Sequence, residues 1–319
     1  MSWSGRHLLE VDELSTDELA AILAEASRQR GLIDDGEGRS AELSGSNVAL
    51  LFAEPSTRTR LSFEVAARRL GAETYVLEPL SSSMVKGETL VDTVRNLDAL
   101  GFGVLVVRHH RSGAAAVAAR YFGGSVVNAG DGWHAHPTQA LLDLFTLTRE
   151  LGTLAGRKVV IVGDVLHSRV AKSNVLTLTR AGADVWLCGP KDWLHGLESL
   201  PVHLTYDLDS ALADAAAVMG LRVQKERMAA GVSLGEYIDR YQITERRLAR
   251  AAPSASYLHP GPINEGVEVT RGVARGPRSL VLEQARNGVP VRMAALLHLR
   301  GSARPSQATS ERDLVRTHG

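Results

Sequence analysis

The sequence predicts an α/β protein with two domains, each a parallel sheet flanked by helices, and a C-terminal helix that returns to the first domain. Apolar segments of strand length alternate with segments of helical periodicity along most of the chain, which is the pattern of parallel sheets covered by helices. The 319 residues suffice for two domains. We place these domains at residues 1–150 and 151–300, with a flexible tail at 301–319.

The first domain is predicted from three buried strands and the helices between them. Ser15 and Glu18 form the pattern of a capping box at the start of the first helix, and Gly31 follows its end. The apolar strand segments are residues 47–53, 103–110 and 125–130. Helical spacing covers residues 87–101, 114–124 and 137–152.

A second alternation predicts the second domain. Its apolar strands are residues 157–165, 184–190 and 216–223, separated by a helix at 168–183 and a short helical piece. A long amphipathic segment at about 279–299 then predicts the helix that packs back on the first domain.

Composition excludes several classes of function. Lys plus Arg and Asp plus Glu number 36 each, so the chain has no net positive charge with which to hold nucleic acid. The single Cys188 forms no internal disulfide and lacks the Cys and His neighbours of a zinc site. No stretch approaches the roughly 20 apolar residues of a membrane span, and the N-terminus has no apolar signal sequence. We expect a soluble, unprocessed protein of the cytoplasm that binds neither membrane nor nucleic acid.

The segment at residues 52–71 predicts an anion site. Pro55 suits the start of a helix, and the hydroxyls of Ser56 and Thr57 can accept hydrogen bonds from amides of the first turn. Those amides and the helix dipole favour an anion, and Arg58 adds a guanidinium that can hold two phosphate oxygens. The alternative is an ordinary capped helix with solvated arginines.

The serine-rich segment at residues 79–90 contains Lys86, followed by Gly87 and a new helix. A loop that carries hydroxyls and an ammonium group can close over a phosphorylated substrate. The alternative is a solvated linker whose lysine has no function.

Two histidines precede the helix that begins at Pro137. His134 and His136 share one face of an extended segment, which is the geometry of a metal pair and supports a metal-dependent amidohydrolase as a rival function. No second cluster of His or carboxylate residues has ligand spacing. His136, beside the start of the helix that contains Gln139, is better placed to hydrogen-bond a polarised carbonyl oxygen.

The second domain begins like a dinucleotide fold, but it lacks the G-x-G-x-x-G sequence, which makes a nicotinamide dehydrogenase a weak rival. Instead, Arg169 enters the next helix at the sheet edge where ligands of open α/β sheets bind. Arg222 and Gln224 follow a comparable strand. Two arginines at two strand ends can hold a dicarboxylate; alternatively, each pairs with an acidic neighbour such as Asp164 or Glu226.

Residues 259–262, His-Pro-Gly-Pro, predict a rigid turn in which Pro262 is a candidate cis proline and the carbonyl groups point in fixed directions. A plain loop is the alternative.

Taken together and in chain order, these segments resemble the aspartate/ornithine carbamoyltransferase family, most closely its aspartate branch. The motifs are STRTR at 56–60, KGETL at 86–90, VVRH at 106–109, HPTQ at 136–139, VGD at 162–164, HSRV at 167–170, RVQKER at 222–227 and HPGP at 259–262. They span nearly the whole chain, and their co-occurrence is far more specific than any single motif. The resemblance implies transfer of the carbamoyl group of carbamoyl phosphate to the α-amino group of L-aspartate, an early step of pyrimidine synthesis.

The resemblance implies a binding site for carbamoyl phosphate. The implied phosphate ligands are the residues at the start of the STRTR segment, Ser56, Thr57, Arg58 and Thr59. Arg108 contacts the phosphate and the carbonyl oxygen, and His136 contacts the carbonyl oxygen. Gln139 and the backbone at Pro260 and Gly261 hold the carbamoyl nitrogen.

For aspartate, the resemblance implies binding by Arg169, Arg222 and Gln224, together with Lys86. Ser82 and Lys86 match a loop that members of the family lend from one subunit to its neighbour, which implies a homotrimer with shared active sites. Ser81 and Ser83 flank Ser82, so the serine register stays open. The sequence also leaves open whether regulatory chains or a dihydroorotase accompany the trimer, and whether nucleotides regulate it.

Two positions depart from the family pattern. His110 stands where proline is common, and Glu265 stands where many relatives have a basic residue. Neither removes a motif residue, although Glu265 can alter the electrostatics of its loop or an ion pair between the domains.

The implied chemistry needs no protein nucleophile, metal or cofactor. The deprotonated amino group of aspartate attacks the carbonyl carbon, a tetrahedral oxyanion forms, and phosphate leaves. The residues expected to orient the substrates and stabilise the oxyanion are Arg58, Thr59, Lys86, Arg108, His136 and Gln139. Ornithine transfer is the near rival, disfavoured because HPGP has no cysteine and RVQKER offers a cation. A metal-dependent hydrolase and a catalytically silent carbamoyl phosphate-binding scaffold are the rivals from other classes.

Overall fold

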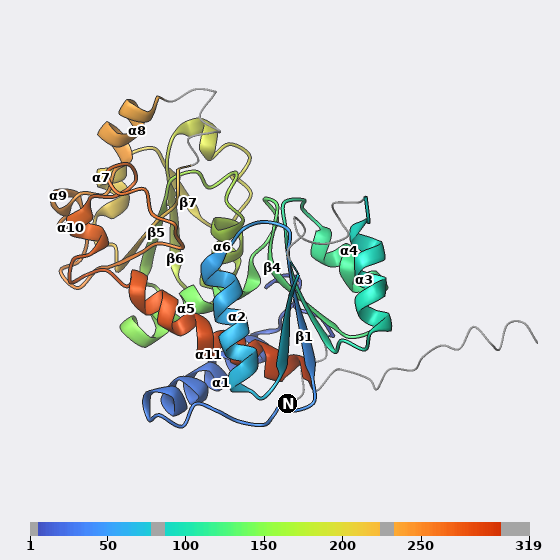
Figure 1. Ribbon diagram of the computed structural model, residues 1–319. Coiled ribbons are helices and arrows are strands. Elements are labelled where there is room, and N and C mark those ends of the chain that lie inside the picture. The colour runs from blue at the N-terminus through green and yellow to red at the C-terminus, as the bar shows by residue number, and fades with distance from the viewer. Residues whose placement is uncertain (1–5, 78–86, 224–232, 301–319) are drawn as a thin grey trace, which may run out of the picture.

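The computed structural model describes residues 6–77, 87–223 and 233–300. They form two parallel sheets, each flanked by helices (Figure 1). The predicted fold class is therefore confirmed. None of the helices in the described ranges is long and apolar enough to cross a membrane.

The first sheet has the strand order β2-β1-β3-β4, and its neighbouring strands are all parallel. Its strands are β1 (Asn47–Phe52), β2 (Glu73–Leu77), β3 (Val104–His109) and β4 (Ser125–Asp131). The helices of this half are α1 (Thr16–Asp34), α2 (Thr57–Arg69), α3 (Leu90–Ala99), α4 (Ala114–Tyr121) and α5 (Pro137–Leu151). The predicted capping box of Ser15 and Glu18 is present. Only β2 is missing from the sequence prediction, because this edge strand keeps its side chains at least partly exposed and lacks a buried apolar run.

The second sheet has the order β7-β6-β5-β8-β9 and is also parallel. Its strands are β5 (Lys158–Val162), β6 (Asp184–Cys188), β7 (His203–Thr205), β8 (Ala217–Gly220) and β9 (Ser256–Leu258). Its helices are α6 (Arg169–Arg180), η3 (Lys191–Trp193), α7 (Leu208–Leu212), α8 (Leu234–Tyr241), α9 (Glu245–Leu248) and α10 (Arg271–Ala274). The prediction missed β7 and β9, which have only three residues each.

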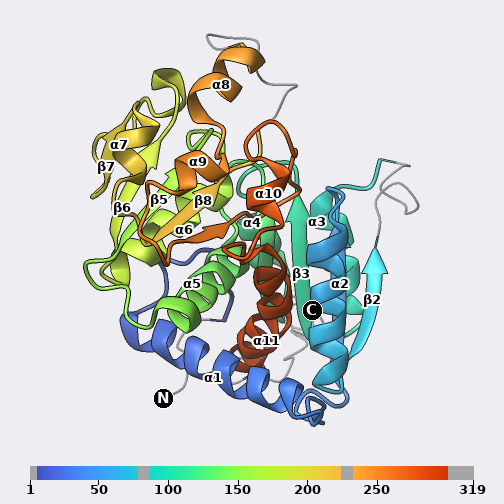
Figure 2. The ribbon, with the colours of Figure 1, turned by 90° about the vertical axis from the view of Figure 1, so that its left-hand side faces the viewer.

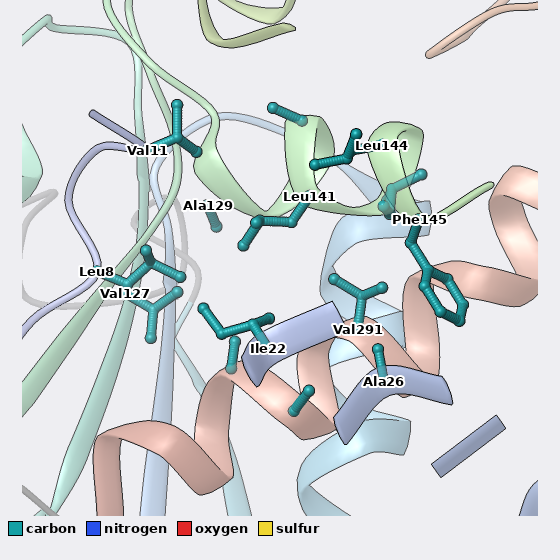
Figure 3. Packing of buried hydrophobic residues seen from close by; sticks show 14 of the residues in the cluster. Leu8, Val11, Ile22, Ala26, Val127, Ala129, Leu141, Leu144, Phe145 and Val291 are labelled. Carbon is teal, nitrogen blue, oxygen red and sulfur yellow. The ribbon is translucent and has the colours of Figure 1, made fainter. Parts of the chain in front are cut away.

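The C-terminal helix α11 (Val281–Arg300) packs against α1, α2 and α5, which confirms its predicted return to the first domain. Figure 2 shows α11 between α5 and α2, with α1 below. In the core, Ile22 and Ala26 of α1 lie against Val291 of α11, close to Phe145 of α5 (Figure 3).

Helix α5 is buried on all sides over its first three turns. Every residue from Pro137 to Leu147 is buried, because α5 lies between β4 and α11 of the first half and α6 of the second. A helix that is enclosed in this way has a fixed position. Side chains at its N-terminus are therefore held rigidly between the two sheets.

We expect the packing of α11 to contribute strongly to stability. Leu296 is fully buried on this helix, whereas Leu282 is 74 % exposed on it. Leu296→Ala should lower the free energy of unfolding by about 2–5 kcal/mol, because it leaves a cavity in the core. The matched change Leu282→Ala should alter it by less than about 0.5 kcal/mol. Urea unfolding at one protein concentration checks both, and equal effects of the two changes would contradict the described packing.

Candidate active site

The two sheets each have a point at which the strand order reverses. This point lies between β1 and β3 in the first sheet and between β5 and β8 in the second. Ligands of open α/β sheets bind at such points, outside the carboxyl ends of the strands. The predicted arginines lie there: Arg108 near the end of β3, Arg169 at the start of α6 after β5, and Arg222 just after β8.

Glu54 joins the two halves of this site. Arg108 Nη2 donates to Glu54 Oε1 at 2.5 Å, and Arg169 Nη2 donates to the same oxygen at 2.6 Å. Arg169 Nη1 donates to Glu54 Oε2 at 3.1 Å. The sequence reasoning missed Glu54. Arg169 thus pairs with an acidic side chain, as the alternative expected, but the partner is Glu54 and not Asp164. Asp164 instead accepts a hydrogen bond from the backbone N–H of His167 and contacts its ring.

The two guanidiniums of this cluster stabilise the Glu54 carboxylate, whereas their own positive charges oppose one another. Desolvation raises the pKa of Glu54, but the hydrogen bonds and charges of Arg169 and Arg108 outweigh it and lower the pKa below its ordinary value. Burial, with the nearby charge of Arg169, lowers the pKa of Arg108 to about 10. At neutral pH a carboxylate is therefore held between two guanidinium cations.

The start of α2 faces this cluster with its own guanidinium. Ser56 is the N-cap residue of α2, but its side chain makes no capping hydrogen bond, which corrects the predicted role for its hydroxyl. Thr57 is exposed and Thr59 is buried. The Arg58 side chain is exposed, although partial desolvation lowers its pKa. Its positive charge also helps to lower the pKa of Arg108.

The turn after β9 meets Arg58. Gly261 has φ +63°, and a Cβ atom at this position would overlap the Arg58 guanidinium. The backbone at Pro260 and Gly261 therefore lies directly against the first domain's arginine. The bond between Gly261 and Pro262 is cis, as the sequence predicted.

His136 and Gln139 occupy the rigid start of α5. His136 is the N-cap residue and is buried, and its backbone N–H donates to Ser173 Oγ of α6 at 3.0 Å. Burial, with the charges of Arg108 and Arg169, lowers the pKa of His136 well below its ordinary value, so its ring is neutral at pH 7. Its buried Nδ1 has no hydrogen-bond partner among the described residues.

His134 does not share this environment. Residues 132–134 form a turn, so the extended segment predicted for the two histidines is wrong. His134 is 42 % exposed, and its ring contacts Glu10 and Asp131. Within the described ranges, no group of three or more His, Cys, Asp and Glu side chains is placed to hold a metal ion.

Of the remaining predicted residues, the structure describes Arg222. Arg222 is exposed, and the carbonyl of the next residue, Val223, accepts a hydrogen bond from Asn264 Nδ2 at 3.1 Å. The predictions for Ser82, with the neighbouring serines, and for Lys86, Gln224 and Glu226 lie outside the described residues.

The two departures from the family pattern both lie on the surface. The His110 ring stacks on that of His109 at 4.3 Å between ring centroids. Glu265 accepts a hydrogen bond from Arg275 Nε at 2.7 Å.

The two parallel sheets of this α/β protein bring arginines from both halves of the chain to one edge, where open α/β sheets usually bind their ligands. The chain belongs to the aspartate/ornithine carbamoyltransferase family. The family's carbamoyl-P binding domain matches residues 6–149, and its Asp/Orn binding domain matches residues 155–299.

Individual relatives cover nearly the whole chain. The aspartate carbamoyltransferase catalytic subunit of Roseiflexus sp. (strain RS-1) is 50 % identical over 304 residues, which is 93 % of this chain and 95 % of that protein. The crystal structure of aspartate transcarbamoylase from Trypanosoma cruzi, in complex with carbamoyl aspartate and phosphate, is 32 % identical with a TM-score of 0.83 and covers 92 % of this chain and 95 % of its own. Ornithine carbamoyltransferase from Pyrococcus furiosus is 29 % identical with a TM-score of 0.85 and covers 95 % of this chain and 100 % of its own.

The contact between the turn and Arg58 predicts an effect on anion binding. Gly261→Ala should displace the guanidinium and weaken the binding of inorganic phosphate about tenfold or more, the effect of losing roughly one charge-assisted hydrogen bond. Gly266→Ala is the matched control, because Gly266 also has positive φ (+87°) but has nothing within 4 Å of the added Cβ. Isothermal titration calorimetry measures both variants. An unchanged phosphate affinity in Gly261→Ala would show that the contact with this turn does not hold Arg58 in place for the anion.

Proposed function

We propose that the protein is an aspartate carbamoyltransferase, which transfers the carbamoyl group of carbamoyl phosphate to the α-amino group of L-aspartate. The products are N-carbamoyl-L-aspartate and phosphate, in an early step of pyrimidine synthesis. The observation that carries the proposal is the 50 % identity to a relative of that name, over 93 % of this chain. In this proposal residues 1–150 bind carbamoyl phosphate and residues 151–300 bind aspartate.

The geometry supports a site for carbamoyl phosphate at the first sheet. The N-terminus of α2 and the Arg58 guanidinium are suited to a phosphate group, because helix amides and a cation both attract an anion. We place Ser56, Thr57 and Thr59 with Arg58 as phosphate ligands. Arg108 lies beside Arg58 and is proposed to contact the phosphate and the carbonyl oxygen.

The carbonyl group is proposed to lie against α5. A neutral imidazole can donate one hydrogen bond, and the buried Nδ1 of His136 is without a partner in the described part of the chain. His136 can therefore bind the carbonyl oxygen as its charge develops. Gln139 and the carbonyl groups of the Pro260–Gly261 turn are proposed to hold the carbamoyl nitrogen. Preorganised donors of this kind typically stabilise an oxyanion by roughly 3–4 kcal/mol each.

The aspartate site is proposed at the second sheet. Arg169 and Arg222 follow β5 and β8, the two strands at the order reversal, where their guanidiniums can hold the two carboxylates of aspartate. Gln224 and Lys86 complete this set in our proposal. The α-amino group, once deprotonated to NH₂, attacks the carbonyl carbon, and phosphate leaves with the electron pair of the broken C–O bond and takes up the proton that the attacking nitrogen releases. This route uses no protein nucleophile, because orientation and charge stabilisation suffice.

The choice of aspartate over ornithine is tested directly. We expect steady turnover of carbamoyl phosphate with L-aspartate and none with L-ornithine. Arg222→Ala should raise the KM for aspartate at least tenfold, because it removes a cation from a carboxylate, while carbamoyl phosphate affinity changes little. Product analysis with both amino acids gives the first result, and steady-state kinetics gives the second. Turnover with ornithine alone, or an unchanged aspartate KM, would contradict the assignment, and loss of activity on chelation would favour the metal-dependent hydrolase.

We further propose a cytoplasmic homotrimer in which Ser82 and Lys86 reach the site of the neighbouring subunit. Exposed apolar side chains at this edge of the first domain support association there: Leu61 and Val65 of α2, and Tyr75 and Val76 of β2, are each at least 40 % exposed. Strand β2 is the edge strand of the sheet, and it directly precedes the segment with Ser82 and Lys86.

Shared sites predict complementation between two inactive variants. Lys86→Ala and Arg58→Ala should each be nearly inactive as pure trimers, because one lacks the lent ammonium and the other lacks the phosphate-binding guanidinium. In a mixed trimer, an Arg58→Ala subunit can lend its intact Lys86 to a Lys86→Ala subunit, which restores one complete site. Activity should therefore reappear, well above either parent, after the two variants are dissociated, mixed and reassembled. Wild-type chains carried through the same treatment are the control, and verified mixed trimers without activity would show that Lys86 acts within its own subunit.

A further inference from the structure

Asp143 is a buried carboxylate one helical turn beyond Gln139 on α5, and the chemistry proposed above does not use it. Its side chain is fully buried and accepts hydrogen bonds from three side-chain amides. Gln139 Nε2 donates to Oδ1 at 2.9 Å, and Gln284 Nε2 of α11 donates to the same oxygen at 2.7 Å. Asn174 Nδ2 of α6 donates to Oδ2 at 2.8 Å. Asp143 therefore joins three helices behind the proposed carbamoyl site.

A carboxylate at this position is costly for the fold. Desolvation raises the pKa of Asp143 to about 6, although the three amide hydrogen bonds and the charge of Arg292 on α11 oppose this shift. Burial also lowers the pKa of Arg292 to about 9. An apolar side chain of similar size would fill the same space without this cost. The ionised group thus needs a reason other than packing.

The hydrogen-bonding character of an ionised carboxylate supplies that reason. It accepts hydrogen bonds and donates none, so only the nitrogen end of each neighbouring amide can face it. Gln139 must therefore turn its Nε2 toward Asp143 and its Oε1 away from it. Asp143 orients Gln284 in the same way, because Gln284 must turn its Nε2 toward the carboxylate. Its Oε1 then accepts a hydrogen bond from the backbone N–H of His259 at 2.9 Å, immediately before the Pro260–Gly261 turn.

A carbamoyl NH₂ group is a donor, so its binding site must offer acceptors. We propose that Asp143 is a positioning residue that fixes the Gln139 amide with its oxygen toward the carbamoyl nitrogen and, through Gln284, holds the turn whose carbonyls face the same group. This inference rests on the proposed function and deepens it. It assigns to Asp143 the recognition of a carbamoyl group over an acyl group of the same shape.

Acetyl phosphate provides the probe, because it replaces the carbamoyl NH₂ by a methyl group and retains the phosphate and the carbonyl oxygen. The wild-type protein should bind carbamoyl phosphate more tightly than acetyl phosphate. Asp143→Ala leaves the Gln139 amide free to rotate and should reduce this preference about tenfold, the effect of losing roughly one hydrogen bond. Acetyl phosphate affinity itself should change little. Isothermal titration calorimetry of the full chain with each ligand gives the ratio of the two dissociation constants.

Asp143→Asn is the matched control. The introduced amide keeps one oxygen to accept from Gln139 and Gln284. Its NH₂ group can donate to Asn174 Oδ1, which has no partner among the described residues, once the Asn174 amide turns over and gives up the hydrogen bond from Nδ2 to the Val170 carbonyl. The preference should therefore stay within about threefold of the wild-type value. In a Gln139→Met background, Asp143→Ala should change the preference by less than it does in the wild-type background, because the part of the effect that passes through Gln139 is already lost and only the part through Gln284 remains.

Each outcome decides the inference. An equal loss of affinity for both ligands in Asp143→Ala, or an unchanged preference, would overturn it and leave Asp143 with a structural role alone. If Asp143→Ala does not fold, Asp143→Ser takes its place, because its hydroxyl can accept from one of the three amides, and the same criteria apply to it. A wild-type protein that binds neither ligand would refute the proposed function itself, whereas wild-type binding of both ligands with equal affinity would refute only the role of Asp143 and Gln139.

Discussion

The ionic contact of Glu54 with Arg108 and Arg169 is the interaction on which the rest of the site depends. One carboxylate receives guanidinium groups from the first sheet and from the first helix of the second domain. All three side chains are largely removed from water, so an unpaired charge here would be strongly destabilising. Without Glu54, Arg108 and Arg169 would repel one another across the junction of the two sheets. The contact therefore neutralises one positive charge where the two sheets meet.

Helix α5 provides the rigid base behind that contact. Its first three turns are enclosed by β4, α6 and α11, and its polar residues bond to neighbours from both halves of the chain. Ser173 and Asn174 of α6 bind the backbone of His136 and the carboxylate of Asp143. A site held by packed helices in this way is better defined than one held by loops alone. The fold therefore fixes the part of the site that faces the proposed carbonyl group. Arg58 and Arg222, in contrast, are exposed and belong to segments outside α5.

The sequence predicted the fold where elements are long and buried. The strands β1, β3, β4, β5, β6 and β8 follow clear apolar runs, whereas β7 and β9 are too short and β2 too exposed for such a signal. Arg58, Arg169 and Arg222 were found because each stands at a strand end or helix start, whereas Arg108 was implied by the family resemblance alone. Glu54 was missed because its partners are 54 and 115 residues away, so an isolated acidic residue beside Pro55 resembles a solvated charge. Asp143 lies within an amphipathic helical pattern, and only the return of α11 shows that its face of α5 is buried.

The balance of charge at the site follows from the same contact. Arg58, Arg108 and Arg169 contribute three positive charges, and Glu54 removes one of them, which leaves two. A phosphate monoester carries roughly −1.5 to −2 at pH 7, so this excess matches the charge of one such group. Arg108 donates to Ala129 and Glu54 through its two terminal nitrogens, while its buried Nε has no partner within the described part of the chain. Glu54 thus orients two guanidiniums and reduces the repulsion between them. The remaining positive charge suffices to balance one phosphate group.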